Sequence, residues 1–290
     1  MGTRNTVIQK ILTKPIQLPP LTKNIHVLMQ ALAEENMSYK QLAEVIKHYP
    51  EITARLIFLV NSPWSAPISP INSIEQACAR LGVSVVKSIS IAISIASSFD
   101  TGKCPSFNTE YFWTSSILVA EGASQLASLI PGRLISIEYI NTAQTAGILH
   151  NLGLLWMADN IPVETNLALQ AYSDNPTAAS VNDLLRQYTG TDYCEIGGLV
   201  AKQMELPETL IITMEQHVND EYQDAGWEIA RLVGSAANMA SALHKQVEEG
   251  AVHSRLEKLG LDSAAQTQVF QQLLKNLEKT RELVKTLFSG

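Results

Sequence analysis

The chain has 290 residues, of which 46% are hydrophobic and 17% are charged, a balance that supports a packed core and excludes general disorder. Its 21 basic and 28 acidic residues give a net charge of −7, which disfavours binding to nucleic acid or to an anionic membrane surface. The scattered cysteines, Cys78, Cys104 and Cys194, predict reduced thiols in a cytoplasmic protein rather than a disulfide framework.

The first predicted element follows an N-terminal tail, residues 1–14, which has no signal-peptide pattern. Apolar residues then recur at helical spacing and predict a helix around residues 25–32. Pro50 suits the first position of another helix, because proline needs no backbone donor there. Further helices begin where Ser38 and Ser73 are each followed three residues later by glutamine, the spacing of a capping box.

A loop is predicted over residues 62–71, because its three prolines each remove a backbone donor and block a preceding helical turn. Asn61 and Ser62 lie directly before it. We expect both residues to cap or turn the chain, since short polar side chains bond to nearby backbone groups. The functional alternative places Asn61 and Ser62 on the rim of a binding site.

The stretch 83–96 is open to two interpretations. Isoleucines at every second position alternate with small residues, and this period of two with β-branched side chains favours a strand. The chain offers no obvious strand partners for it, so we interpret the stretch as a buried helix. It carries Lys87 and four serines, and is too short and too polar to span a bilayer.

A polar segment, residues 100–108, holds Gly102 and Pro105 and predicts a linker between two helical halves. Long helices are predicted beyond it at about 109–129 and 136–158. The tail 263–288 has apolar residues on one side, so it either packs on the body of the protein or offers a surface to a partner.

His150 is the most informative of the six histidines. Small residues, Ala146 and Gly147, precede it and permit another helix to approach closely. Gly153 follows it and weakens a helix by about 1 kcal/mol, so we expect a packing or functional reason for this glycine. A lone histidine in an apolar helix is more often a hydrogen-bonded core residue than a metal ligand.

The segment AGILHNLG around His150 resembles the xGLLHDIG segment of the HD-related output domain family, HDOD. Other segments agree with that family in order and spacing: LPPL near residue 18, the Asn61-Ser62 loop, YFWTSSILVAEGASQLA (Tyr111 to Ala127) and GTDYCEIGG…MEQHV (Gly190 to Val218). The resemblance covers about residues 15–245. Each motif alone is weak, and only their common order is specific.

The HD superfamily that the resemblance implies binds one or two metals between helices, through histidines and aspartates. This chain departs from that ligand set at most positions, and the changes remove the charge that a divalent cation needs. The residues expected at a vestigial pocket are Thr114, His150, Asn151, Asp192, Tyr193, His217 and Asn238. Only His150 and His217 remain as candidate metal ligands, unless Asp192 or Glu195 supplies a carboxylate.

We therefore expect an all-α fold with two lobes, residues 15–100 and 101–247, of which the second is a degenerate HD-type bundle, and a C-terminal extension, residues 248–290. The resemblance implies a non-catalytic signalling module in the cytoplasm, without a cofactor, that acts through a protein partner and that also allows a homo-oligomer. One alternative is a metal-dependent phosphohydrolase with atypical ligands around His150 and His217. Another is a pocket that binds a nucleotide or small signal without turnover.

Overall fold

The computed structural model describes residues 28, 37–63, 65–132, 135–176, 178–246 and 256–288, and every regular element in these ranges is helical. The predicted all-α class is therefore confirmed. The predicted tail, residues 1–14, the LPPL segment at 18–21 and the helix at 25–32 lie outside the described residues, apart from the buried Leu28. No single helix in these ranges is long and apolar enough to cross a membrane.

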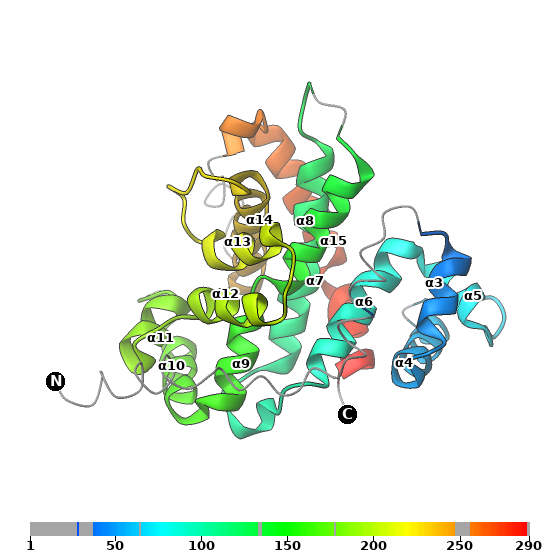
Figure 1. Ribbon diagram of the computed structural model, residues 1–290, viewed down its shortest axis with the longest axis horizontal. Coiled ribbons are helices and arrows are strands. Elements are labelled where there is room, and N and C mark those ends of the chain that lie inside the picture. Colours follow the sequence, from blue (N-terminus) through cyan, green and yellow to red (C-terminus); the bar gives the residue numbers. More distant parts are fainter. Residues whose placement is uncertain are drawn as a thin grey trace.

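The first lobe contains α3 (Tyr39–Ile46), α4 (Pro50–Val60) and α5 (Ile74–Leu81), which Figure 1 shows grouped at one side of the molecule. The predicted capping box at Ser38 is formed in both directions with Gln41. Ser73 caps α5 through one bond, from the backbone N–H of Gln76 at 3.2 Å. Pro50 is the first residue of α4, as its fixed φ favours.

The ambiguous stretch is a helix, α6 (Val83–Ala96), and the helical prediction is confirmed. It contacts α4 and α5 of the first lobe and α8 (Ile137–Leu149) of the second, so apolar residues on several of its sides are buried. Its buried serines differ, because the Ser90 hydroxyl has no partner among the described residues and the Ser94 hydroxyl bonds to the preceding turn. The Ser94 hydroxyl donates to the Ser90 carbonyl at 2.7 Å.

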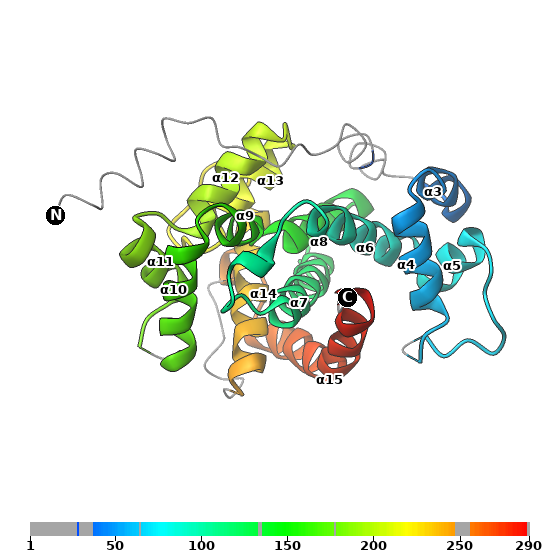
Figure 2. The ribbon, with the colours of Figure 1, turned by 90° about the horizontal axis from the view of Figure 1, so that it is seen from below.

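The second lobe is a bundle around α7 (Thr109–Ser128), which packs against α8 and against α14 (Trp227–Lys245). Figure 2 shows the remaining helices of this lobe to one side of that central group. They are α9 (Leu152–Asn160), α10 (Pro162–Asp174), α11 (Val181–Thr189), α12 (Tyr193–Gln203) and α13 (Glu208–Gln216).

The single helix predicted over residues 136–158 is wrong, because the structure divides it into α8 and α9 at His150 and Asn151. Asn151 leaves the helical conformation with φ −109° and ψ 18°. The His150 ring also bonds to the Gly147 carbonyl at 2.7 Å, and so takes up an acceptor at the end of α8. The break lies at the residue pair that the resemblance marked as the centre of the site.

Two glycines permit the close helix contacts that surround this break. A Cβ on Gly147 would lie 2.6 Å from the Ala120 Cα of α7, and a Cβ on Gly153 would lie 2.0 Å from the Tyr193 carbonyl oxygen of α12. Neither position has room for a side chain. The close helix approach predicted at Gly147 is confirmed, and the reason for Gly153, which the sequence left open between packing and function, includes close packing.

The C-terminal helix α15 (Ser263–Phe288) packs on α7 and also contacts α4 of the first lobe. The Phe288 ring stacks on Trp113 with centroids 4.6 Å apart and planes inclined by 7°. The predicted linker 100–108 is likewise attached to the second lobe, since Lys103 pairs with Asp159 at 2.5 Å and Ser106 N–H donates to Asn166 at 2.7 Å.

Candidate functional site

A cavity of about 610 Å³ lies in the second lobe beside the break between α8 and α9. Helices α7, α10, α11, α12, α13 and α14, or residues directly at their ends, supply the rest of its wall. Of the predicted pocket residues, His150, Asn151, Tyr193, His217 and Asn238 line this cavity. The fold therefore brings most of the predicted set together from four separate segments of the sequence.

The two histidines that line the cavity form an adjacent buried pair. Their ring centroids are 5.2 Å apart and their planes are perpendicular. Nδ1 of His150 lies 2.7 Å from the Gly147 carbonyl, and Nδ1 of His217 lies 3.0 Å from the Thr213 carbonyl. A carbonyl only accepts, so Nδ1 carries the proton in each ring and Nε2 is left as an acceptor.

The remaining nitrogens of the two rings have different surroundings. Nε2 of His217 accepts a hydrogen bond from the Tyr193 hydroxyl at 3.3 Å. Nε2 of His150 has no hydrogen-bond partner among the described residues, although the side chain is only 5% exposed and lines the cavity. The pair therefore presents one acceptor that is used and one that is open to a ligand.

Burial keeps both imidazoles uncharged at neutral pH. Desolvation lowers the pKa of His150 to about 3, with a smaller contribution from His217. Desolvation also lowers the pKa of His217 to about 4, against the opposing effect of its bonds to the Thr213 and Met214 carbonyls. Burial raises the pKa of the neighbouring Tyr193 well above its usual range, so its hydroxyl stays protonated.

Thr114, predicted as the counterpart of a metal-binding histidine, does not line the cavity, and this assignment is corrected. Its side chain is fully buried in the core, and its hydroxyl has no partner among the described residues. Ser115, one position later, faces the cavity together with Tyr111 and Val119. These three positions are spaced by four residues and share one face of α7, while a shift of one residue turns a side chain by about 100°.

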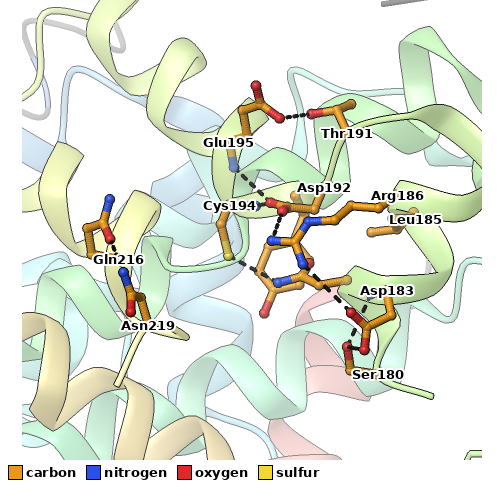
Figure 3. Close-up of polar contacts among 12 residues, drawn as sticks. Ser180, Asp183, Leu185, Arg186, Thr191, Asp192, Cys194, Glu195, Gln216 and Asn219 are labelled. Carbon is orange, nitrogen blue, oxygen red and sulfur yellow. Dashed lines mark hydrogen bonds and ion pairs between the residues drawn. The ribbon is translucent and has the colours of Figure 1, made fainter. Parts of the chain in front are cut away.

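Asp192 is also absent from the wall of this cavity, because its carboxylate is used elsewhere. It caps α12 by accepting from the backbone N–H groups of Cys194 at 2.7 Å and Glu195 at 2.9 Å. The same carboxylate forms an ion pair with Arg186. Figure 3 shows the Arg186 side chain lying between Asp192 and Asp183.

A second cavity, of about 520 Å³, lies beyond Arg186 and is lined by Asp192, Glu195 and Glu215 among others. The Glu195 carboxylate accepts from the Thr191 hydroxyl at 2.5 Å, and Glu215 pairs with Lys202 at 2.6 Å. Each acidic group therefore already has a partner. Asp192 and Glu195, the carboxylates considered as substitute metal ligands, therefore line a different cavity from the histidine pair.

Asn61 and Ser62 line neither cavity. The Asn61 amide bonds to the backbone on both sides of the loop, donating to the Ile57 and Ile71 carbonyls at 2.9 and 2.7 Å and accepting from Ile71 N–H at 2.8 Å. Ser62 donates to the Leu59 carbonyl at 2.7 Å. These contacts match the expected turn role. The alternative, a binding rim, stays a prediction that neither of these two cavities supports.

Several residues of the wall were not singled out from the sequence. Tyr111, Tyr172 and Asn182 come from α7, α10 and α11, and their presence depends on how these helices dock. Lys245 at the end of α14 lies 5.4 Å from the centroid of the Tyr172 ring. The sequence of a single helix does not show which of its residues line a cavity between helices. The only such indication here is the four-residue spacing of Tyr111, Ser115 and Val119 along α7.

The HD superfamily implies a divalent metal at this position, and the donor set does not fit one. The imidazole pair is neutral, and Asn151 and Asn238 supply amides where a hard cation needs carboxylates. The two carboxylates of the wall are already bonded: Asp183 accepts from the Ser180 hydroxyl at 2.7 Å, and Asp220 pairs with Arg231 at 3.1 Å. The Asn151 side-chain oxygen already accepts from the Ser116 hydroxyl at 3.2 Å. Among the described residues, no group of three or more His, Cys, Asp or Glu side chains is arranged to hold a metal ion.

The family model of the HDOD domain matches residues 18–220. A solved "Putative signal transduction protein" from Marinobacter aquaeolei is similar over 99% of this chain and 66% of its own length, so this chain spans about two thirds of it, with 18% identity and a TM-score of 0.82. A "Putative phosphohydrolase" from Shewanella amazonensis is similar over 98% of this chain and 99% of its own, with 22% identity and a TM-score of 0.71.

An "HDOD domain protein with unknown function" from Geobacter sulfurreducens has a TM-score of 0.74 at 20% identity, and the match covers 99% of this chain and 98% of that one. A search of curated proteins finds no match. The similarity to the three solved structures confirms the two-lobed fold.

Proposed function

Because the chain belongs to the HDOD domain family, we propose that it is a non-catalytic regulatory module of bacterial signal transduction, which works in the cytoplasm through a protein partner. One observation carries the non-catalytic part of the proposal. At the His150–His217 pair, where a metallohydrolase would hold its ion, no carboxylate of the described residues is available that is not already bonded elsewhere.

The chemistry of phosphoester hydrolysis explains why this matters. A metal-dependent hydrolase uses the ion to acidify a water molecule, and it needs anionic ligands to offset the charge of the ion in a dry site. Two neutral imidazoles and two amides do not offset that charge, and burial makes both imidazoles weak bases, with pKa values of about 3 and about 4. The cavity therefore supports binding, not hydrolysis.

The test is a metal analysis of the purified protein combined with an assay on bis(4-nitrophenyl) phosphate, with and without added Mn²⁺ or Mg²⁺. We expect far less than one bound metal per chain and no hydrolysis above the metal-only background. One tightly bound metal per chain, together with activity that His150→Ala removes, would establish the alternative function instead.

That alternative, a phosphohydrolase with atypical ligands, is supported by the placement of two histidines side by side at the expected position. It requires both Nε2 atoms to face one ion, and Tyr193 already donates to one of them. The hydroxyl would have to move away before a metal bound. The non-catalytic proposal needs no such rearrangement.

The partner half of the proposal is supported by apolar side chains on the surface of the first lobe. Phe58 is 63% exposed and Ile68 is fully exposed, at 104%. The acidic net charge makes a protein surface a better partner than nucleic acid or an anionic membrane. Light scattering of the protein and of Phe58→Asp distinguishes a homo-oligomer, which the substitution would dissociate, from a monomer that awaits a different partner.

A further inference from the structure

The wall of the 610 Å³ cavity has the chemistry of a small-molecule site rather than of an ion site. Its volume is within the range of about 300–1,000 Å³ in which pockets enclose organic ligands. The residues at the bottom are uncharged hydrogen-bonding groups and aromatic rings. This combination sets three requirements for a ligand, concerning its charge, its hydrogen-bond donors and its shape.

The charge of the wall is close to balanced. Among its described residues, Arg186 and Lys245 are basic, and Asp183 and Asp220 are acidic. Arg186 is paired with Asp192 and lies 3.7 Å from Asp183, and Asp220 is paired with Arg231 at 3.1 Å. Because most of these charges are already paired, the wall favours an uncharged ligand over a multiply charged phosphate.

Two acceptors on residues of this wall lack a donor, and they differ in their access to the cavity. Nε2 of His150, which lines the cavity, has no partner among the described residues, and its proton is held on Nδ1 by the Gly147 carbonyl. Asn182, at 7% exposure, donates to the Cys194 sulfur at 3.3 Å, and its Oδ1 is sealed inside the wall without a partner. A ligand that brings an N–H group to Nε2 of His150 therefore gains a hydrogen bond in a site largely shielded from water.

Tyrosine rings from three helices give the cavity its aromatic character. Tyr111, Tyr172 and Tyr193 line it from α7, α10 and α12. Burial raises the pKa of Tyr111 to about 12, so this ring also keeps a neutral hydroxyl. Flat heterocycles such as nucleic-acid bases stack favourably on such rings.

We propose that the cavity binds an uncharged nucleoside whose base carries an exocyclic amine. The base lies among the tyrosine rings and its amine donates to the open Nε2 of His150. The inference rests on the proposed non-catalytic function, because it requires the nucleoside to be bound and released without chemical change. The module then has an input, the nucleoside, in addition to its protein partner.

Calorimetric titration with matched nucleosides tests the role of the amine. Guanosine and inosine differ by one amine, and cytidine carries an amine where uridine has a carbonyl. We expect guanosine or cytidine to bind at least tenfold more tightly than its matched partner, and the 5′-monophosphate to bind no more tightly than the nucleoside. Equal affinity within both pairs, absence of binding at millimolar concentration, or a tenfold gain from the phosphate would each overturn the proposal.

Substitutions locate the binding site. His150→Phe removes the acceptor and keeps a ring, so it should weaken binding of the preferred nucleoside at least tenfold and abolish the preference for the amine. His48→Phe, in the exposed turn that follows α3, is the matched control and should bind like the parent protein. If His150→Phe does not fold, Tyr172→Leu replaces it, because it removes one of the three rings of the cavity and should weaken nucleoside binding at least tenfold. Unchanged affinity in a folded variant contradicts the assignment.

Chromatography of the nucleoside after incubation separates this inference from the proposed function. We expect the compound to be recovered intact. Recovery of a free base or a deaminated product would keep the binding site but refute the non-catalytic proposal. Absence of nucleoside binding in a protein that also lacks metal and phosphodiesterase activity would refute only the inference.

Discussion

Each histidine of the cavity is held by backbone carbonyls about one helical turn earlier in the chain, Gly147 for His150 and Thr213 for His217. The two rings are thereby fixed in one tautomer, with Nε2 as the acceptor. Their importance was predictable, because the sequence around them carries a family pattern. The roles of Ser115 and Asn182 were not predictable. The resemblance pointed to Thr114, one residue before Ser115, and Asn182 reaches the cavity only through the way its helix docks.

At this scale, the buried histidines make stability depend on pH. In the unfolded chain both bind protons below about pH 6.5, whereas in the folded protein their pKa values are about 3 and about 4. The unfolded state therefore binds more protons as the pH falls, and the free energy of unfolding decreases. We expect a loss of about 2 kcal/mol for each histidine between pH 7 and pH 5.

Urea denaturation at pH 7 and pH 5 measures this loss in the parent protein and in His150→Gln. The variant should lose about 2 kcal/mol less over the same interval. Burial also lowers the pKa of His244 to about 4. Because His244 is present in both proteins, its contribution to the loss of stability cancels in the comparison. Parallel pH profiles for the two proteins would show that His150 is not buried and neutral.

The missing charge can also be restored. Asn151→Asp combined with Asn238→Asp places two carboxylates in the wall beside the histidine pair. We expect the double variant to bind Mn²⁺ at least tenfold more tightly than the parent, since carboxylates offset the charge of the ion. Asn108→Asp caps α7 with an equal acceptor outside the cavity and serves as the charge control. An affinity no different from that control would mean that geometry, not charge, prevents binding.

At the scale of elements, caps and prolines predicted where helices begin, and period alone misjudged where they end. Ser38 and Pro50 begin α3 and α4 as expected. The stretch 83–96 has the period of a strand but forms a helix. Because this helix is buried on several sides, apolar residues at every second position do not expose a hydrophobic surface. The break at Asn151 was missed, because the apolar pattern continues through it and neither proline nor a local charge marks it.

The contact between α9 and α12 depends on Gly153. A Cβ there would lie 2.0 Å from the Tyr193 carbonyl oxygen, and backbone on both sides resists displacement. We expect Gly153→Ala to lower the free energy of unfolding by about 3 kcal/mol, despite the higher helix propensity of alanine. Gly102→Ala, whose Cβ would meet only the flexible Asp100 carboxylate at 3.2 Å, should change it by less than about 1 kcal/mol. Thermal unfolding of both variants shows whether Gly153→Ala destabilises the protein more than Gly102→Ala does.

At the scale of the whole molecule, α15 joins the two lobes. It lies along α7 and reaches α4, where the Arg55 guanidinium donates to the Leu287 carbonyl. Its amphipathic pattern was evident in the sequence and left two outcomes open. Burial of Leu273 and Leu277 shows that the apolar side packs on the protein, while Leu274 stays 47% exposed.

The stack of Phe288 on Trp113 contributes to this joint. Phe288→Ala should lower the free energy of unfolding by about 1–3 kcal/mol, from lost burial and lost ring contact. Leu274→Ala on the same helix is the control and should have an effect below about 0.5 kcal/mol. Equal losses in chemical denaturation would indicate that the end of α15 does not pack on α7 in solution.

The ion pair of Arg186 with Asp192 has a consequence for access to the interior. Arg186 and Val218 border both the histidine-lined cavity and its acidic neighbour, so their side chains stand between the two compartments. Shortening the Arg186 side chain should widen the connection between them. A molecule too long for either compartment would then have room to extend across both, so we expect position 186 to influence the length of ligand that the protein accepts.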